Sequence, residues 1–327
     1  HRRNHPHDHA HAREFAPRIA EFEDAGKIAR DFWLACGKAG FLCPTLPEAY
    51  GGPGLDFTFN AILNEEFTYA MMADSITLQS DITMPYILHY GSDEQKARIL
   101  PKMLSGETIA AIAMTEPGAG SDLQAVRTSA RREGEEYVVD GSKTFITNGQ
   151  NADLIITVCK TDASLGARGT SLVLVESHRT GFARGRNLDK LGQWMADTSE
   201  LFFNGVRVPA ANLLGEENRG FIYLVSDLPQ ERLSISITAQ AAAQRAFDEA
   251  VAYTKQRVAF GQRVIDFQNT RFTLADIKAK LQVGWAHLDW AIERHIAGDL
   301  TADEAAASKY WHTEMQWLAC DAALQLH

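Results

Sequence analysis

The spacing of hydrophobic residues changes twice along the chain, from helix-like to strand-like and back again. From Phe15 to about Thr108, apolar residues recur three and four positions apart, as they do on the buried face of a helix. Between Ile109 and about Asn218 they fall in short runs or alternate with polar residues, which is the pattern of strands. After Gly220 the helical spacing returns. The pattern predicts an α+β protein, with a β domain inserted between two helical domains.

Two sites have the residue types of a capping box, which marks the start of a helix. Ser92 is followed three residues later by Gln95, and Thr301 is followed by Glu304. The second site predicts a last helix that runs towards Leu326.

An apolar run in the first helical region is spaced along one face of a helix. It contains Phe59, Ile62, Leu63 and Phe67. We predict that these side chains belong to a core between helices and do not form the wall of a ligand site.

The strand-like region contains two residue pairs that are typical of tight hairpin turns. Asp140-Gly141 and Asn204-Gly205 are each flanked by strand-forming residues, and such pairs tolerate the positive φ angles of a type I′ turn. We therefore predict a hairpin at each pair, within an antiparallel sheet. Leu154 to Cys159 and Ser171 to Val175 predict two buried strands, joined by a flexible loop at Gly166 to Gly169.

Length and composition limit the classes of protein that fit. The 327 residues, 45% of them apolar, are enough for two or three domains with buried cores, which we place at 1–108, 109–219 and 220–327. The formal net charge of −10 argues against a surface that binds nucleic acid. No apolar run reaches the roughly 20 residues that a membrane-spanning helix needs. Four cysteines without a C-x-x-C pair predict reduced thiols and no zinc site.

Both ends of the sequence look cut. The chain has no initiator methionine, so a targeting segment could precede it, and we expect further residues after His327. Five of the eleven histidines lie between His1 and His11. Alternate histidines on a terminal tail are most often solvated or derived from a vector, so we predict no functional metal site.

The stretch from Met114 to Asp122 is the leading candidate for a ligand site. It follows an apolar run and reads Met-Thr-Glu-Pro-Gly-Ala-Gly-Ser-Asp. Its glycines allow a flat ligand or a phosphate to approach the backbone, and the hydroxyls of Thr115 and Ser121 can donate hydrogen bonds. The pattern alone leaves two interpretations open, because Pro-Gly and Gly-Ser pairs also form ordinary surface turns.

A second stretch favours the ligand site. Residues 115–122 are followed by Gly141-Ser142-Lys143-Thr144-Phe145-Ile146-Thr147-Asn148-Gly149, and the two stretches together resemble the flavin-binding signature of the acyl-CoA dehydrogenases. The resemblance extends from about Phe15 to His327. It implies an N-terminal helical domain, a middle antiparallel β domain and a C-terminal helical bundle that is incomplete in this sequence. It also implies FAD as the cofactor and a homotetramer.

The resemblance assigns flavin contacts to three groups of residues. The first would contact the isoalloxazine ring or a phosphate, the second would form another wall, and the third would bind the dinucleotide, partly in a neighbouring subunit. The groups are Ile112, Met114, Thr115, Gly120 and Ser121; Phe145, Ile146 and Thr147; and Arg257, Gln268, Gln325, Leu326 and His327. Arginine suits the third group because its fork binds two phosphate oxygens at once.

The resemblance also implies a reaction, in which a glutamate removes the α-proton of a fatty acyl-CoA thioester while flavin N5 takes the β-hydride. Residues 228–233, Leu-Pro-Gln-Glu-Arg-Leu, resemble the stretch that carries this glutamate in the long-chain branch, so Glu231 is the candidate catalytic base. Because proline favours the first turn of a helix, we expect Pro229 to start one and Glu231 to lie in its first turn. A surface glutamate that favours the helix dipole would fit the same pattern.

Several other residues are expected to contact the substrate. Besides Ser121 they are Ala167, Arg168, Tyr223, Pro229, Gln230 and Arg232. The resemblance implies a trans-2-enoyl-CoA product, an electron-transfer flavoprotein as partner, and the bacterial cytoplasm or, in a eukaryote, the mitochondrial matrix as the location. The length and branching of the acyl chain stay open.

Two other functions are compatible with the sequence. A flavin-dependent oxidase or monooxygenase on the same scaffold would use O₂, and oxygen access depends on pocket packing that a sequence does not reveal. A non-catalytic acyl-CoA-binding protein is the other alternative. The intact stretch from Met114 to Asp122 and the presence of Glu231 argue against it.

Overall fold

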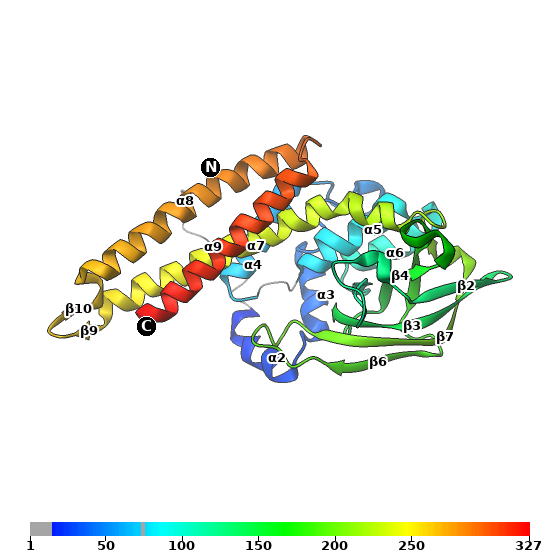
Figure 1. The fold of residues 1–327 in the computed structure, drawn as a ribbon, viewed down its shortest axis with the longest axis horizontal. Coiled ribbons are helices and arrows are strands. Elements are labelled where there is room, and N and C mark those ends of the chain that lie inside the picture. Colours follow the sequence, from blue (N-terminus) through cyan, green and yellow to red (C-terminus); the bar gives the residue numbers. More distant parts are fainter. Residues whose placement is uncertain (1–14, 73–75) are drawn as a thin grey trace. The chain divides into compact units, whose positions relative to one another are not determined.

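The computed structural model describes residues 15–72 and 76–327, which form two units. The sheet unit comprises residues 17–56 and 76–227, and the helical unit comprises residues 15–16, 57–72 and 228–327. Helices precede and follow the strands along the chain (Figure 1), which confirms the predicted α+β class. The five histidines between His1 and His11 lie outside the described residues.

Short helices form the first part of the sheet unit. They are α2 (Ile19–Ala25), α3 (Arg30–Ala39), the π-helix η4 (Leu78–Thr83), α5 (Met84–Tyr90) and α6 (Asp93–Leu104). The predicted capping box is present at the start of α6. The Ser92 hydroxyl accepts a hydrogen bond from the Gln95 N–H, and the Gln95 side chain accepts one from the Ser92 N–H. Phe22, Phe32 and Trp33 pack edge to face in the core of this part.

Eight strands form one sheet in the order β6-β7-β3-β2-β4-β5-β8, with β1 paired to β4. They are β1 (Ala110–Ala113), β2 (Ser129–Glu133), β3 (Glu136–Thr147), β4 (Leu154–Lys160), β5 (Thr170–Glu176), β6 (Phe182–Asn187), β7 (Thr198–Pro209) and β8 (Leu213–Leu214). Most neighbours are antiparallel, as predicted, but β4 pairs in parallel with β1 and β2. The two predicted buried strands are β4 and β5, and their inward side chains join those of β3 and β7 in the core.

The two predicted hairpins are wrong. Asp140-Gly141 and Asn204-Gly205 lie opposite each other in β3 and β7, at a single β-bulge. β3 and β7 each run uninterrupted through the pair, and in their antiparallel ladder Asp140 lies opposite both Asn204 and Gly205. Gly205 adopts a positive φ of 62°, as the extra residue of such a bulge often does. Its N–H donates to the Asp140 carboxylate at 2.7 Å. The actual turn between β2 and β3 lies at Gly134.

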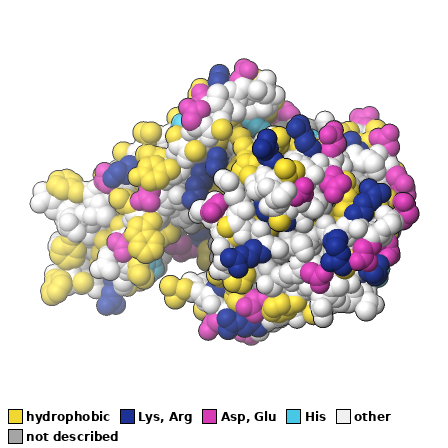
Figure 2. Space-filling view, turned by 45° about the vertical axis from the view of Figure 1, so that its right-hand side comes forward, with side chains coloured by type: hydrophobic (Ala, Val, Ile, Leu, Met, Phe, Trp, Pro, Cys, Tyr) yellow, Lys and Arg dark blue, Asp and Glu magenta, His cyan; other side chains and the backbone are white. Residues whose placement is uncertain are grey.

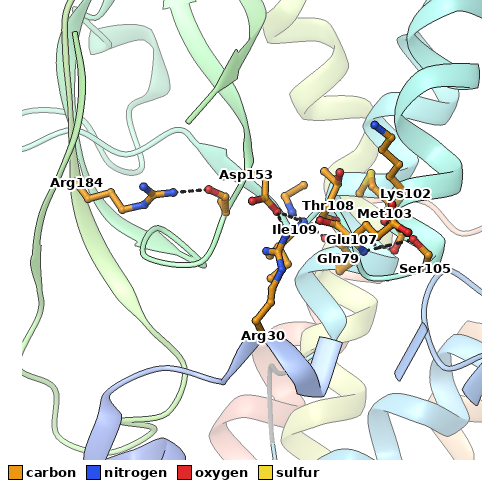
Figure 3. A network of polar contacts seen from close by, with 12 residues as sticks. Arg30, Gln79, Lys102, Met103, Ser105, Glu107, Thr108, Ile109, Asp153 and Arg184 are labelled. Atoms are coloured by element: carbon orange, nitrogen blue, oxygen red, sulfur yellow. Dashed lines mark hydrogen bonds and ion pairs between the residues drawn. The ribbon is translucent and has the colours of Figure 1, made fainter. Parts of the chain in front are cut away.

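A polar network ties the helices of the sheet unit to the starts of β1 and β4 (Figure 3). The buried Gln79 of η4 donates to the carbonyl of Thr108 at 2.7 Å and accepts from the N–H of Ala110 at 2.9 Å. Arg30 of α3 pairs with Asp153, at 2.8 Å. Because Gln79 contacts both Thr108 and Ala110, the first residue of β1, these contacts fix where that strand begins and therefore where the loop after it lies.

Long helices and one small hairpin form the helical unit. They are α4 (Phe57–Tyr69), most of α7 (Gly220–Gln256), β9 (Val258–Ala259), β10 (Gln262–Arg263), α8 (Gln268–Ile296) and α9 (Ala302–Leu326). The predicted capping box is present at Thr301 and Glu304, at the start of α9. Phe57 and Ala61 of α4 pack with Leu233 of α7 and with residues of α8 in one core cluster.

The predicted core face of α4 is wrong in part. Phe67 is buried as expected, but Phe59 and Ile62 are 43% and 40% exposed, whereas Asn60 and Asn64 are buried. The reason is that α4 carries apolar residues on all sides. The spacing of its apolar residues therefore does not determine which side of α4 packs against α7 and α8. In the structure, the packed side is the one that includes Asn60 and Asn64.

Residues 15–72 and 76–327 contain no helix that is both long and apolar enough to cross a membrane. No group of three or more potential metal-ligating side chains occurs there either.

Gly37 of α3 lies against the backbone at the end of α6. A Cβ at Gly37 would be 2.2 Å from the carbonyl oxygen of Ser105 and 2.9 Å from that of Leu104. Backbone atoms cannot move aside as a flexible side chain can. We therefore expect Gly37→Ala to lower the free energy of unfolding by roughly 1–3 kcal/mol, although alanine favours helix more than glycine does.

Thermal unfolding followed by circular dichroism measures this effect. Gly118→Ala is the matched control, because a Cβ there would meet no atom within 4 Å. Equal unfolding midpoints for Gly37→Ala and the wild-type protein would contradict the close backbone packing of α3 on α6.

Candidate active site

The stretch from Met114 to Asp122 forms a tight turn after β1. The backbones of Glu116 and Ala119 exchange two hydrogen bonds, of 2.8 and 3.1 Å. A Cβ at Gly118 or Gly120 would meet no atom within 4 Å, so the outer side of the turn is open. The two interpretations that the sequence left open are therefore compatible. The stretch forms a surface turn, and a ligand can closely approach its outer side.

A buried lysine of β3 supports this turn from below. The Lys143 ammonium donates to the Glu116 carboxylate at 2.9 Å, to the carbonyl of Met114 at 3.0 Å and to that of Val158 in β4 at 2.7 Å. Its side chain is fully shielded from solvent. Three donors therefore meet three acceptors, which is the condition under which a buried ammonium is tolerated. The lysine fixes the turn relative to two strands of the sheet.

Glu116 is held as firmly as its partner. Its carboxylate accepts hydrogen bonds from the backbone N–H groups of Arg127 at 2.7 Å and Thr128 at 2.9 Å. Burial by itself raises the pKa of the Glu116 carboxyl, but these donors and the charge of Lys143 outweigh burial and hold the pKa below its usual value. The Glu116 carboxyl is therefore ionised at neutral pH, whereas burial lowers the pKa of its partner, Lys143.

Phe145 is presented to the surface by a second bulge between β3 and β7. Thr144 and Phe145 together lie opposite Glu200 in the ladder. Phe145 has a positive φ of 59°, which costs a residue with a Cβ about 1–2 kcal/mol, and its ring is 65% exposed. A strained backbone that exposes a large apolar ring points to a functional surface, since packing gains nothing from it.

The two stretches of the flavin-like signature lie side by side. The N–H of Thr144 donates to the carbonyl of Thr115 at 2.9 Å, so the turn is joined directly to the strand that carries Phe145. Gly120 and Ser121 are exposed, and Ile112, Met114, Thr115 and Thr147 are partly buried. Ile146 differs, because its side chain lies in the core of the sheet, so any ligand contact there comes from its backbone.

This surface suits a flavin ring. A flat heteroaromatic system needs an apolar wall and hydrogen-bond donors along its edge. The exposed ring of Phe145 provides the wall, and the hydroxyls of Thr115, Thr147 and Ser121 provide polar groups at its margin.

The third group of predicted flavin residues gathers at one end of the helical unit. Arg257 directly precedes the β9–β10 hairpin, and its carbonyl accepts from the N–H of Val264 at 2.8 Å. Gln268 is the first residue of α8, and Leu326 packs against a core cluster to which α7, α8 and α9 each contribute a residue.

The last residue of the chain belongs to the same end. The rings of His327 and Tyr253 stack with centroids 4.1 Å apart, and the Tyr253 hydroxyl donates to the His327 carbonyl. In the part of the chain that the structure describes, the Arg257 guanidinium has no hydrogen bond or ion pair, so it can bind an anion such as a diphosphate.

Glu231 lies inside α7, which corrects the expectation that Pro229 starts this helix. α7 begins at Gly220 and continues through the proline, which only removes one backbone hydrogen bond. Glu231 is therefore about three turns from the helix start, too far for the helix dipole to explain it. It is half-buried, and the side chain of the preceding residue, Gln230, contacts His295 at 3.1 Å. The backbone of this turn is thus fixed.

The remaining predicted substrate residues are spread over both units. Ala167 and Arg168 lie in a 3-10 segment between β4 and β5 (η6, Ala163–Gly169), and Arg168 is exposed. Tyr223 stacks on Tyr90 with centroids 4.0 Å apart, and its hydroxyl accepts from the Glu216 N–H. Pro229 and Arg232 are half-buried on α7.

Sequence reasoning quoted Lys143 and Glu116 as parts of a motif but assigned no role to either. A lysine between two strand residues is normally a solvated side chain, and a glutamate before Pro-Gly is normally a turn residue. The signal that could have found them is charge, because Lys143 is the single charged residue of residues 141–149 and Glu116 is one of the two acidic residues of residues 114–122.

Three family models match consecutive parts of this chain. They describe the N-terminal domain of acyl-CoA dehydrogenase at residues 9–107, the middle domain at residues 111–206 and the C-terminal domain at residues 218–327. The boundaries that we drew at residues 108 and 219 stay predictions.

Individual proteins are similar over most of their length. The mitochondrial long-chain specific acyl-CoA dehydrogenase of Sus scrofa is 45% identical over 317 residues, which are 96% of this chain and 74% of that protein. The crystal structure of an acyl-CoA dehydrogenase from Geobacillus kaustophilus superposes with a TM-score of 0.94 at 45% identity, covering 99% of this chain and 89% of that one. A glutaryl-CoA dehydrogenase of Mycobacterium smegmatis, solved in complex with FADH2, has a TM-score of 0.89 at 26% identity, covering 97% and 82%.

We expect Lys143→Met to be strongly destabilising, because it leaves the buried Glu116 carboxylate without its countercharge. Breaking a buried pair in this way costs roughly 3–5 kcal/mol. Glu116→Gln should also destabilise, and the double variant should lose less than the sum of the two single losses. Urea unfolding of the three variants measures this coupling.

Arg207→Met is the control for that cycle. Arg207 pairs with Glu133 and Glu136 on the surface, so its loss should cost less than about 1 kcal/mol. Additive losses for Lys143→Met and Glu116→Gln would mean that the pair does not act as one support.

Two substitutions at Phe145 separate backbone strain from the role of the ring. Glycine accepts a positive φ and alanine does not, so Phe145→Gly should be about 1 kcal/mol more stable than Phe145→Ala. Both variants lack the ring, so both should bind FAD more weakly than the wild-type protein and to a similar degree. Urea unfolding and quenching of flavin fluorescence measure the two quantities. Phe202→Ala, at another exposed phenylalanine of the sheet, should leave FAD affinity unchanged.

Proposed function

The chain belongs to the acyl-CoA dehydrogenase family and is an enzyme of that class, and we propose that it oxidises a fatty acyl-CoA thioester to the trans-2-enoyl-CoA. The observation that carries this proposal is the strained, exposed Phe145 beside the open turn at Met114 to Ser121. That surface has the wall and the donors that a flavin requires, and little else accounts for its strain.

Glu231 is the proposed catalytic base, which accepts the proton from the α-carbon of the thioester. Its turn of α7 is held on one side by the contact between Gln230 and His295 and on the other by the fully buried Leu233. A fixed helical backbone restricts where the carboxylate can reach, which is what proton transfer at a single carbon demands.

The cofactor is proposed to be FAD, which when bound supplies the acceptor for the β-hydride. The ring would lie against Phe145, with Thr115, Thr147 and the backbone near Ile146 at its edge. Arg257 would bind the diphosphate, with Gln268 and residues 325–327 around it. Proton removal itself needs only Glu231 and a correctly placed thioester.

The protein is proposed to be a homotetramer, in which a neighbouring subunit completes the flavin site. Arg257 follows Glu231 by 26 residues along α7, so the two lie roughly 40 Å apart. A single flavin that contacted both Glu231 and an Arg257 would therefore need the Arg257 of a neighbouring subunit. Figure 2 shows hydrophobic side chains exposed on the surface. Those exposed on α8 and α9 include Val283, Trp317 and Leu324, and a neighbouring subunit would cover them. Reduced enzyme is proposed to pass its electrons to an electron-transfer flavoprotein.

An anaerobic titration tests the proposed function. The full-length protein, loaded with FAD, is titrated with acyl-CoA thioesters of increasing chain length while the visible flavin absorbance is followed. Bleaching of the flavin is the expected result, and its dependence on chain length ranks the substrates. A well-loaded flavin that none of the thioesters bleaches would contradict the proposal.

Glu231→Gln should keep FAD but abolish bleaching by acyl-CoA. The amide has nearly the shape of the carboxylate, so the fold and the cofactor site should persist, while the proton has no acceptor. We expect the rate of flavin reduction in stopped-flow experiments to fall by at least about 10²-fold, in the range that general base catalysis contributes. Glu249→Gln, at an exposed ion pair with Arg245 further along α7, is the control and should reduce its flavin at the wild-type rate. Wild-type bleaching by Glu231→Gln would remove Glu231 from the mechanism.

A further inference from the structure

A histidine near the end of α8 contacts the residue that precedes the proposed base. The Nε2 atom of His295 lies 3.1 Å from the side-chain oxygen of Gln230 on α7. Because an amide oxygen only accepts hydrogen bonds, the histidine is the donor. Gln230 is among the residues that we expect to contact the substrate, yet its oxygen already accepts a hydrogen bond inside the helical unit.

The contacts on either side of Glu231 set the rotation of α7 about its own axis. Because successive residues of a helix point about 100° apart, the side chains of Gln230 and Leu233 point only about 60° apart. Leu233 is fully buried in a core cluster with Phe57 of α4 and Leu288 of α8. Glu231 points about 100° away from Gln230 and about 160° away from Leu233. Its direction therefore follows from the rotation that the other two side chains impose.

The last turn of α8, which carries His295, is itself held from two directions. The ring of His295 packs edge to face on that of Phe57, with centroids 4.6 Å apart. The preceding residue, Arg294, donates to the carbonyl of Asp299 at 2.6 Å and pairs with Glu304 at 3.4 Å. Glu304 belongs to the capping box of α9. The support of His295 thus comes from α4 and from the start of α9.

α7 lacks a backbone hydrogen bond in the turn that carries the proposed base. Pro229 has no N–H to donate, two residues before Glu231. Helices kink most readily at proline. The hydrogen bond from His295 to Gln230, one residue after the proline, opposes such a movement.

We propose that His295 is a positioning residue for the reaction, which fixes the direction of Glu231 through its hydrogen bond to Gln230. This inference rests on the proposed function, since it presupposes that Glu231 is the base. Proton removal from a single carbon is sensitive to such placement, because a displacement of about 1 Å can lower a rate about 10²-fold.

Stopped-flow reduction of the FAD-loaded, full-length protein by a saturating acyl-CoA thioester tests the proposal. His295→Leu keeps an apolar side chain against Phe57 but has no N–H. We expect its rate of flavin reduction to fall about tenfold, with a change of less than about twofold in the Kd of the thioester, because the pocket persists while the base is misdirected. His295→Gln, which keeps an N–H donor, should recover most of the rate.

A second substitution tests whether Gln230 transmits the effect. Gln230→Leu should slow flavin reduction to a similar degree. The double variant of His295→Leu and Gln230→Leu should be no slower than either single variant, because both remove the same hydrogen bond. Additive losses would overturn the proposal. So would a wild-type rate in His295→Leu, or failure of His295→Gln to recover the rate.

Trp285→Phe is the matched control on the same two helices. The indole N–H of Trp285 donates to the Gln244 side chain at 3.3 Å, so this variant also removes a hydrogen bond between α8 and α7. Gln244 lies roughly 20 Å beyond Glu231 along the helix. Trp285→Phe should therefore reduce its flavin at the wild-type rate. A loss as large as that of His295→Leu would mean that any weakening of this packing slows the reaction, which contradicts a specific role for His295.

Hydrogen exchange separates failure of this inference from failure of the proposed function. Amide exchange of residues 228–236, followed by mass spectrometry, requires no substrate and no turnover. These amides should exchange about five- to tenfold faster in His295→Leu than in the wild-type protein, and at the wild-type rate in Trp285→Phe. If no thioester bleaches the wild-type flavin, the proposed function fails, and faster exchange in His295→Leu still supports His295 as the residue that fixes this turn. Unchanged exchange in His295→Leu overturns the inference even if the wild-type enzyme is fully active.

Discussion

The buried ion pair between Lys143 and Glu116 is the interaction on which the candidate flavin surface depends. Each charge taken out of water costs several kcal/mol, and the pair is tolerated because every donor and acceptor around it is used. Lys143 joins β3 to the turn through Met114 and to β4 through Val158. Glu116 joins the same turn to the backbone that leads into β2. If β3, β4, the turn or the backbone before β2 moves, Lys143 or Glu116 loses a hydrogen bond, and the buried pair is destabilised. This explains why a turn whose outer side is open can still be held in one conformation.

The two bulges between β3 and β7 show how one ladder serves different purposes. At the first, the extra residue is Gly205, which adopts a positive φ without cost, and the Asp140 carboxylate satisfies its N–H. At the second, a residue with the same backbone angle is Phe145, which pays for that angle in strain. The first bulge only adjusts the twist of the strands. The second turns a large ring outward beside the Met114 to Asp122 turn, and we connect its strain with ligand binding for that reason.

Residue types predicted structure well where it depends on neighbours in the sequence. They failed where the structure depends on residues far away in the chain. The capping boxes at Ser92 and Thr301 were correct because both halves of each box lie within four residues. Asp140-Gly141 and Asn204-Gly205 were misread as turns because each pair tolerates a bulge equally well, and only the register between β3 and β7 distinguishes the two. Pro229 was taken for a helix start, since the sequence does not reveal that packing around Leu233 carries α7 through it. The flavin-like stretches were recognised as motifs, but the pairing of Lys143 with Glu116 needed the fold.

The helical unit takes its residues from two parts of the chain that are far apart. Phe57 and Ala61 of α4 share a core cluster with Leu233 and Leu288, so the partners of α4 are made roughly 170 to 230 residues later. A ribosome adds roughly 5–20 residues per second, so α4 leaves the exit tunnel on the order of ten to fifty seconds before its packing surface exists. During that interval its apolar residues have no native neighbours. Nascent chains of this protein are consequently expected to present α4 to cellular chaperones until α8 has been synthesised.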